Sequence, residues 1–277
     1  MTIPQYYKDA GLTHFSASQL NKPVANWIFD YLYLDYSRRR NIKVGYNAAL
    51  GTNAHNAIQA VLCHGQSVED AIKDAVMGIE FHDSPTSELT EKRDKFIEIL
   101  PDMVNNGVNL LAEQFGGAED ERRIELPMEG IDVPIVGFID LVASDSFLEI
   151  KTKAARQGAV KKDGTRGWTK GSLPAKPEFY HLSQVAIYWK ATGLTPHIAY
   201  VAAHDAVLFS PDNCDELSQD YLEYCLEDMR GKAMRRQNLL KLSTDPKVLA
   251  GLVDPDFNHP FYWDEETKDE ARELWKI

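Results

Sequence analysis

The sequence predicts an α+β, or mixed α/β, fold with a helical N-terminal part. Up to about residue 120, apolar side chains recur at helical spacing. From Arg122 to Thr152 they alternate or run continuously, as in β-strands, and beyond residue 177 helical and strand-like segments alternate again. The expected order is therefore helices, three strands, a helix, two strands and a helix.

Four helices are expected in the first part. The first, over 15–36, begins at the cap-type residues Ser16 and Ser18 and carries Pro23 in its first turn. The others are 46–64, ended by Gly65; 67–79, capped by Ser67; and 90–115, which Pro101 can break and Gly116 and Gly117 end.

The second part begins with three strands and ends with a long helix. The strands 122–127, 133–142 and 147–152 are expected to form a meander with turns near Gly130 and Asp145. Segment 153–176 has four glycines and many basic residues, which indicates a long loop. The remaining elements are a helix over 177–191 that stops at Gly193, a hairpin of 197–203 and 206–209, and a helix over 212–242 capped by Asp212.

We expect a single domain over residues 1–277 without internal repeats. Its parts are a mostly helical segment (1–120), an αβ core (121–242) and a C-terminal tail (243–277). The tail is acidic and aromatic, and capping of the core is its expected role.

Composition indicates a globular chain with an uneven charge. Hydrophobic residues make up 44% and charged residues 26%, which excludes a disordered chain. The net charge of −12 argues against a generic nucleic-acid binder. However, residues 151–176 hold eight basic residues and one acidic residue, a net of +7, so the rest of the chain carries −19.

The three cysteines, Cys63, Cys214 and Cys225, show no CxxC spacing, so buried free thiols are expected. There is no apolar stretch typical of a secretory signal and none long enough to span a membrane. These features indicate a cytoplasmic protein without a membrane partner.

Asp140, Glu149 and Lys151 form the most informative pattern. Asp140 falls near the end of one expected strand, and Glu149 and Lys151 lie two apart on the next, so they share a face. Ile150 points the other way, into the core. Two carboxylates and a lysine at a strand end suit Mg²⁺ and phosphodiester hydrolysis, in which the lysine positions the attacking water.

A simpler interpretation of this pattern is a solvated ion pair on a strand face. The chain even repeats the spacing at Asp256, Glu266 and Lys268, but that copy lies in a polar tail without strand-like flanks and is rejected as a site. Gln184 and Tyr188 share a helix face, and His55 lies on the second helix. Taken singly, each of these three residues is more often structural.

Together these residues resemble the RecB-like exonuclease branch of the PD-(D/E)xK nuclease superfamily. The motifs appear in the family's order: Phe15-Ser-Ala-Ser-Gln-Leu20, Gly51 with His55, an acidic residue at Glu125, Gly137-x-x-Asp140, Glu149-Ile-Lys151 and Gln184-x-x-x-Tyr188. The resemblance spans roughly residues 15–210. Ile139 stands where the superfamily's name has proline.

The resemblance implies a restriction-endonuclease-like core with a central mixed β-sheet flanked by helices. It implies one or two Mg²⁺ or Mn²⁺ ions held by His55, Asp140, Glu149 and the carbonyl of Ile150. Lys151 would position the nucleophile, and Gln184 and Tyr188 would orient the site and contact the DNA backbone. Many relatives hold an iron–sulfur cluster, but its cysteines are absent from this sequence, so no cluster is expected.

The basic segment beside this pattern is the expected DNA-binding region. Lysine and arginine bind phosphates, and an exposed tryptophan can stack on an unpaired base. The alternative is a solvated, flexible loop. The residues expected to contact DNA are Lys153, Lys161, Lys162, Arg166, Trp168 and Lys170.

The leading functional hypothesis is a metal-dependent DNA exonuclease acting on linear ends in recombination, repair or phage DNA metabolism. The preference for an exonuclease comes from the resemblance. The alternatives are a structure-specific or restriction-type endonuclease and a catalytically silent DNA-binding subunit. A homo-oligomer and a recombination partner protein are left open.

Overall fold

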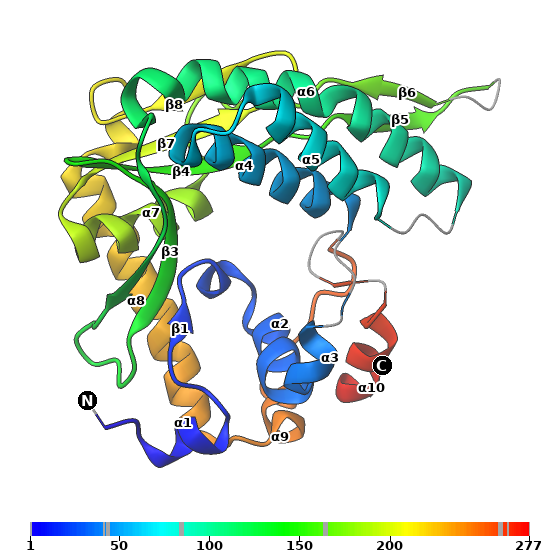
Figure 1. Ribbon diagram of the computed structural model, residues 1–277. Coiled ribbons are helices and arrows are strands. Elements are labelled where there is room, and N and C mark those ends of the chain that lie inside the picture. Colours follow the sequence, from blue (N-terminus) through cyan, green and yellow to red (C-terminus); the bar gives the residue numbers. More distant parts are fainter. Residues whose placement is uncertain are drawn as a thin grey trace.

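The computed structural model describes residues 2–40, 42, 45–82, 86–162, 166–259, 263–264 and 266–276. It confirms the mixed α/β fold: a sheet of parallel and antiparallel strands is covered by helices (Figure 1). The strand order is β1-β3-β4-β7-β8, with β2 paired to β3. The strands are β1 (Phe15–Ser16), β2 (Glu119–Leu126), β3 (Ile135–Val142), β4 (Ser146–Thr152), β7 (Thr195–Val201) and β8 (Ala206–Phe209).

The expected meander and the second hairpin are both present. β2 and β4 each pair antiparallel with β3, and β8 pairs antiparallel with β7. β7 instead lies parallel to β4, because the chain crosses over through α7 (Phe179–Thr192) before it returns to the sheet. This crossover makes β4 a central strand, buried on both faces along most of its length.

Helices cover both faces of the sheet and bury two hydrophobic clusters. On one face lie α4 (Tyr46–His64), α5 (Val68–Glu80) and α6 (Ser87–Phe115), and Leu148 and Ile150 belong to their cluster. On the other face α7 packs against α8 (Gln219–Leu242). Figure 1 shows these layers, with the short helices α1 (Gln5–Asp9), α2 (Val24–Ile28), α3 (Tyr36–Arg40), α9 (Pro246–Ala250) and α10 (Lys268–Trp275) gathered below them.

Several helix signals read from the sequence are confirmed. Gly65 and Gly193 adopt the left-handed conformation (φ of 66° and 70°) directly after α4 and α7. The Ser67 side chain caps α5 by accepting a hydrogen bond from the Asp70 N–H. α6 runs through Pro101 without a break, so one missing N–H did not end this well-packed helix.

The expected helix over 15–36 is wrong in its first part, whereas residues 24–33 are helical. Phe15 and Ser16 form a short strand that pairs parallel with Ile135 and Val136, and a 3₁₀ turn (Gln19–Asn21) follows. Pro23 is extended and precedes α2, which passes into a π-helical turn (Phe29–Tyr33). The serine pattern misled because Ser16 and Ser18 contact each other rather than cap a helix.

The expected long loop over 153–176 is also wrong in part, because it contains a hairpin of β5 (Arg156–Val160) and β6 (Arg166–Thr169). Gly158 lies close to the Gly167 carbonyl, where a side chain would be tight. The glycines therefore permit close strand pairing rather than disorder. Asp163 lies outside the described residues. Asp212 is likewise not a cap, since a 3₁₀ turn (Asp215–Leu217) separates it from α8.

The tail packs onto the core, as expected. Trp263 is buried against Phe29 and Phe257, at ring-centroid distances of 5.8 and 4.7 Å. Cys214 and Cys225 are buried free thiols, and Cys63 is half-buried and also free. Within the described parts of the chain, no helix is long and apolar enough to cross a membrane.

Candidate active site

The candidate site lies at a gap along one edge of β3. At the end of β3, Leu141 and Val142 pair with β4, whereas at its start Ile135 and Val136 pair with β1. Among the described residues, no strand pairs with this edge of β3 between these two points. The Asp140 side chain bridges the gap, because its Oδ2 accepts a hydrogen bond from the Ile150 N–H of β4 at 2.7 Å.

Asp140, Glu149 and Lys151 come together as the sequence predicted. The Lys151 ammonium forms an ion pair with Oε1 of Glu149, a residue that is only 2% exposed. The other oxygen, Glu149 Oε2, is buried and has no hydrogen-bond partner among the described residues. A buried carboxylate oxygen without a partner is costly, so this atom is suited to a cationic ligand.

Burial shifts the pKa values of these three side chains. It raises the pKa of Asp140 to about 6, although Lys151 and the Ile150 N–H oppose the shift. Burial and the nearby Asp140 raise the pKa of Glu149 to about 7. Burial lowers the pKa of Lys151, but Glu149 and Asp140 outweigh it, so its pKa is above the ordinary lysine value and the ammonium stays charged.

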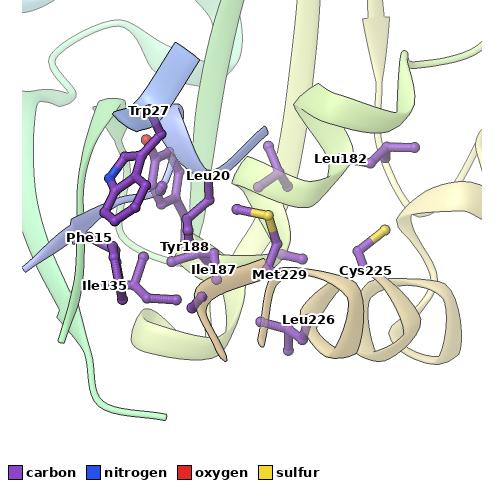
Figure 2. Close-up of a cluster of buried hydrophobic side chains, with 14 of the residues drawn as sticks. Phe15, Leu20, Trp27, Ile135, Leu182, Ile187, Tyr188, Cys225, Leu226 and Met229 are labelled. Atoms are coloured by element: carbon purple, nitrogen blue, oxygen red, sulfur yellow. The ribbon is translucent and has the colours of Figure 1, made fainter. Parts of the chain in front are cut away.

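Gln184 and Tyr188 of α7 hold Lys151 from the other side. The Lys151 ammonium donates to Gln184 Oε1 at 3.3 Å, and Gln184 Nε2 donates to the Tyr188 hydroxyl at 2.6 Å. The backbone of Phe138 also hydrogen-bonds this hydroxyl. Tyr188 is 1% exposed and lies in the cluster that contains Trp27 and Met229 (Figure 2). Its burial supports the orienting role and leaves no surface for the expected contact with DNA.

Two glycines of the predicted motifs make room for this arrangement. A Cβ on Gly137 would come within 2.4 Å of the Tyr188 ring, so only glycine lets α7 approach β3 this closely. A Cβ on Gly51 would lie 2.9 Å from Oγ1 of Thr152, where α4 crosses the end of β4. Both glycines therefore set how near a helix lies to the site.

His55 reaches the site from α4. Its Nδ1 lies 3.7 Å from Asp140 Oδ2, and one turn later Gln59 donates to the Asp140 carbonyl at 2.9 Å. Burial lowers the pKa of His55, so the ring is neutral near pH 7 and keeps a nitrogen lone pair for a metal.

Glu121 is a nearby acid that the sequence analysis missed. It lies between Asp120 and Arg122 of β2, which pair with Leu141 and Ile139 on either side of Asp140, and its charge acts on both Asp140 and His55. Its φ of 49° is left-handed, which is unusual for a residue other than glycine. Strand register, rather than residue spacing, is the signal that identifies it.

Glu125, the acid expected on this strand, lies away from the site. It faces Val136 in the register and pairs with Arg123 at 2.6 Å.

The donors present fit a divalent cation. No three His, Cys, Asp or Glu side chains in the described chain already converge as a metal cage. Lys151 holds one oxygen of Glu149, and the other oxygen has no hydrogen-bond partner in the part of the chain that the structure describes. Asp140 is adjacent, and His55 is neutral. The Ile150 N–H points toward Asp140, and in an extended strand the carbonyl of the same residue points to the same edge. Hard oxygen donors with one imidazole suit Mg²⁺ or Mn²⁺.

The basic segment is more structured than expected. Lys153 pairs with Glu178 and lies over the Tyr200 ring, and Arg166 pairs with Glu88 at 2.9 Å. Trp168 is half-buried against Phe96, at a centroid distance of 6.3 Å, instead of exposed. Three of the six residues expected to contact DNA are thus held by protein contacts, and the three exposed ones are Lys161, Lys162 and Lys170.

The second copy of the acidic pattern forms no site. Glu266 pairs with Arg38 at 2.6 Å, and Lys268 begins α10. The second pattern therefore lacks the strand context of the first, as the sequence predicted.

No family model and no curated protein matches the sequence. Among solved structures, the crystal structure of SSO0001 is similar to 58% of this chain and 84% of its own, at 16% identity and a TM-score of 0.27. A likeness at this TM-score supports no statement about function.

Proposed function

We propose that this chain is a divalent-metal-dependent DNA nuclease that hydrolyses phosphodiester bonds, with linear DNA ends as its preferred substrate. The observation that carries the proposal is the group of Asp140, Glu149 and Lys151 at the open edge of β3. Its carboxylates have raised pKa values, and its lysine is held by a hydrogen-bonded pair from a separate helix. Burying the Glu149 carboxylate, with Asp140 and Lys151 partly buried beside it, costs stability, so a purely structural role would not explain the group.

Each residue has a distinct role in this proposal. His55, Asp140, Glu149 and the Ile150 carbonyl would hold Mg²⁺ or Mn²⁺, which supplies Lewis-acid stabilisation of the phosphoryl oxygens. The charged Lys151 would position the attacking water and stabilise the developing negative charge. Gln184 acts through Lys151, because its Oε1 accepts from the ammonium while its Nε2 is fixed by Tyr188.

Cleavage of two DNA forms tests the proposal. End-labelled linear DNA and closed circular DNA are incubated with Mg²⁺, with Mn²⁺ and with EDTA. Degradation of linear DNA alone, dependent on metal, is the expected result. Nicking of circular DNA would show that the protein is an endonuclease instead of an exonuclease. Intact DNA in every mixture would contradict the proposal.

The proposal also includes a cellular setting in recombination, repair or phage DNA metabolism, which rests on the resemblance. A recombination partner protein and a homo-oligomer rest on the same resemblance. They do not affect the cleavage test.

A further inference from the structure

A cavity of about 420 Å³ lies beside the candidate active site. Its lining residues come from α6, from the residues after β4, from the end of β6 and from the turn between β7 and β8. Figure 1 shows the β5–β6 hairpin beside α6. Its volume falls in the range of roughly 300–1,000 Å³ that is typical of small-molecule sites. No residue of the proposed metal site lines it, whereas three residues expected to contact DNA do: Lys153, Trp168 and Lys170.

Three lysines from three separate segments converge on this cavity. Lys95 comes from α6, Lys153 follows β4 and Lys170 follows β6, with Asp102 as the acid in the lining. Lys95 pairs with Glu98 at 2.6 Å and Lys153 pairs with Glu178, whereas Lys170 is exposed and forms no ion pair within the described residues. The lining itself holds three lysines against one aspartate, but Glu98 and Glu178 outside it offset two of the lysines, so Lys170 is the lysine that these ion pairs leave available to an anion.

Apolar side chains line the same cavity. Trp168 and Ile99 contribute to it, and Phe96 packs edge-to-face against the Trp168 ring. A flat ring held next to lysine side chains matches the two ends of a nucleotide, because the ring can stack on the base while an ammonium binds the phosphate.

A second depression adjoins this cavity near the end of β4, the strand that carries Glu149 and Lys151. This depression, of about 200 Å³, shares Lys153 and Ala155 with the cavity and extends to Thr152 at the end of β4. Thr152 directly follows Lys151. Both depressions therefore lie at the end of this strand.

We infer that this cavity binds a nucleotide, with its phosphate on Lys170 and Lys95 and its base against Trp168. The nucleotide is either part of a DNA strand or a free nucleoside monophosphate. Binding of a nucleotide within a DNA strand rests on the proposed function, whereas binding of a nucleotide as such does not.

Tryptophan emission tests the inference directly. dAMP and, separately, a short oligonucleotide without terminal phosphates are titrated into the protein in EDTA, which prevents cleavage. We expect saturable quenching that Trp168→Phe abolishes and Trp189→Phe retains, since Trp189 lies on α7 outside the cavity. If only the oligonucleotide quenches the emission, the bound nucleotide is part of a DNA strand. If dAMP quenches it, the cavity binds a free or terminal nucleotide.

Calorimetry provides a second measurement that does not depend on tryptophan. Lys170→Ala is expected to weaken binding about tenfold, the scale of one lost charge-assisted hydrogen bond. Lys176→Ala is the matched control, because Lys176 belongs to the same basic segment but lies outside the cavity lining. Equal effects of the two variants, or no binding of either ligand, would overturn the inference. Because EDTA is present throughout, these outcomes are independent of whether the protein cuts DNA.

Discussion

At the scale of single residues, the candidate site has its charges balanced by a few short contacts. Glu149 is buried beside the partly buried Asp140, and Lys151 is the cation that offsets their charges. A divalent ion bound to the same oxygens would relieve the remaining repulsion. Ligands that bind only the folded state stabilise it by mass action.

Metal binding should therefore appear as thermal stabilisation. We expect millimolar Mn²⁺ to raise the Tm of the wild-type protein by several degrees, the shift that about 1–2 kcal/mol produces in a chain of this size. Asp140→Asn keeps an acceptor for the Ile150 N–H but loses the charge, so it should lose most of this response. An equal shift in both proteins would show that the ion binds elsewhere.

His181 gives the protein a pH dependence outside the metal site. Burial, followed by Lys151 and Lys153, lowers the pKa of His181 to about 2, and its Nδ1 lies 2.7 Å from the Tyr200 hydroxyl. The hydroxyl accepts from the Glu178 N–H, so its proton is free to be donated to the neutral ring.

The sign follows from the lowered pKa. The unfolded chain binds a proton below pH 6.5 and the folded chain does not, so stability falls on acidification by up to about 1.4 kcal/mol per pH unit. Urea unfolding of the wild type and of His181→Asn between pH 7 and pH 5 measures this loss. The wild type should lose more stability than the variant, and parallel curves would exclude His181 as the cause.

At the scale of elements, the approach of α7 to β3 decides how Lys151 is held. The helix itself was predicted from its apolar periodicity, and its end was predicted from Gly193. The Gly137 position was predicted only as part of a motif. The structure adds the physical reason, since the Tyr188 ring occupies the space of the missing side chain.

Gly137→Ala should therefore separate the helix from the strand. We expect a loss of about 1–3 kcal/mol, the cost of overpacking a core, together with a lower rate of cleavage. Gly45→Ala is the control, because a Cβ there meets no described atom within 4 Å and the backbone φ is negative. Chemical denaturation of both variants checks this, and a stable Gly137→Ala protein would contradict the packing argument.

Elements with strong periodicity were predicted well, and elements set by distant contacts were not. α4, α5 and the three-strand meander follow from local patterns and caps. β1 could not be predicted, because two residues become a strand only when β3 offers an open edge. The β5–β6 hairpin was missed because its basic, glycine-rich sequence has little apolar alternation of its own.

The candidate site shows the same division. Asp140, Glu149 and Lys151 depend on strand alternation and were predicted together. Glu121 depends on the register between two strands, which spacing along one strand does not reveal. Lys153 pairs with Glu178, and Trp168 packs against Phe96 of α6. These contacts depend on how the hairpin folds over α6, so both side chains are less exposed than the sequence predicted.

At the scale of the whole molecule, charge separates into an acidic body and a basic hairpin region. The net charge is −12, yet residues 151–176 carry +7. Lys161 and Lys162 are exposed at the end of β5, whereas Arg166 is paired with Glu88. DNA should therefore be attracted to this region and repelled by the rest of the surface.

Replacing Lys161 and Lys162 together by serine should weaken DNA binding and make it less sensitive to salt. The slope of log affinity against log salt should fall in magnitude by about 1.5, the effect of two lost phosphate contacts. Lys8→Ser with Lys247→Ser changes charge equally on α1 and α9, which lie at the other end of the molecule (Figure 1). Equal slopes for the two double variants would refute a localised DNA-binding surface.

The central claim is that Glu149 belongs to a nuclease site, and its second copy in the sequence supplies the control. Glu149→Gln and Glu266→Gln make the same chemical change in two matching patterns, but Glu266 pairs with Arg38 far from β3. The measurement is the rate of Mg²⁺-dependent cleavage of end-labelled linear DNA by the wild type and both variants. We predict a loss of at least about 100-fold for Glu149→Gln, the scale of a lost catalytic charge, and an unchanged rate for Glu266→Gln. Full activity of Glu149→Gln, or no cleavage by the wild type, would contradict the account.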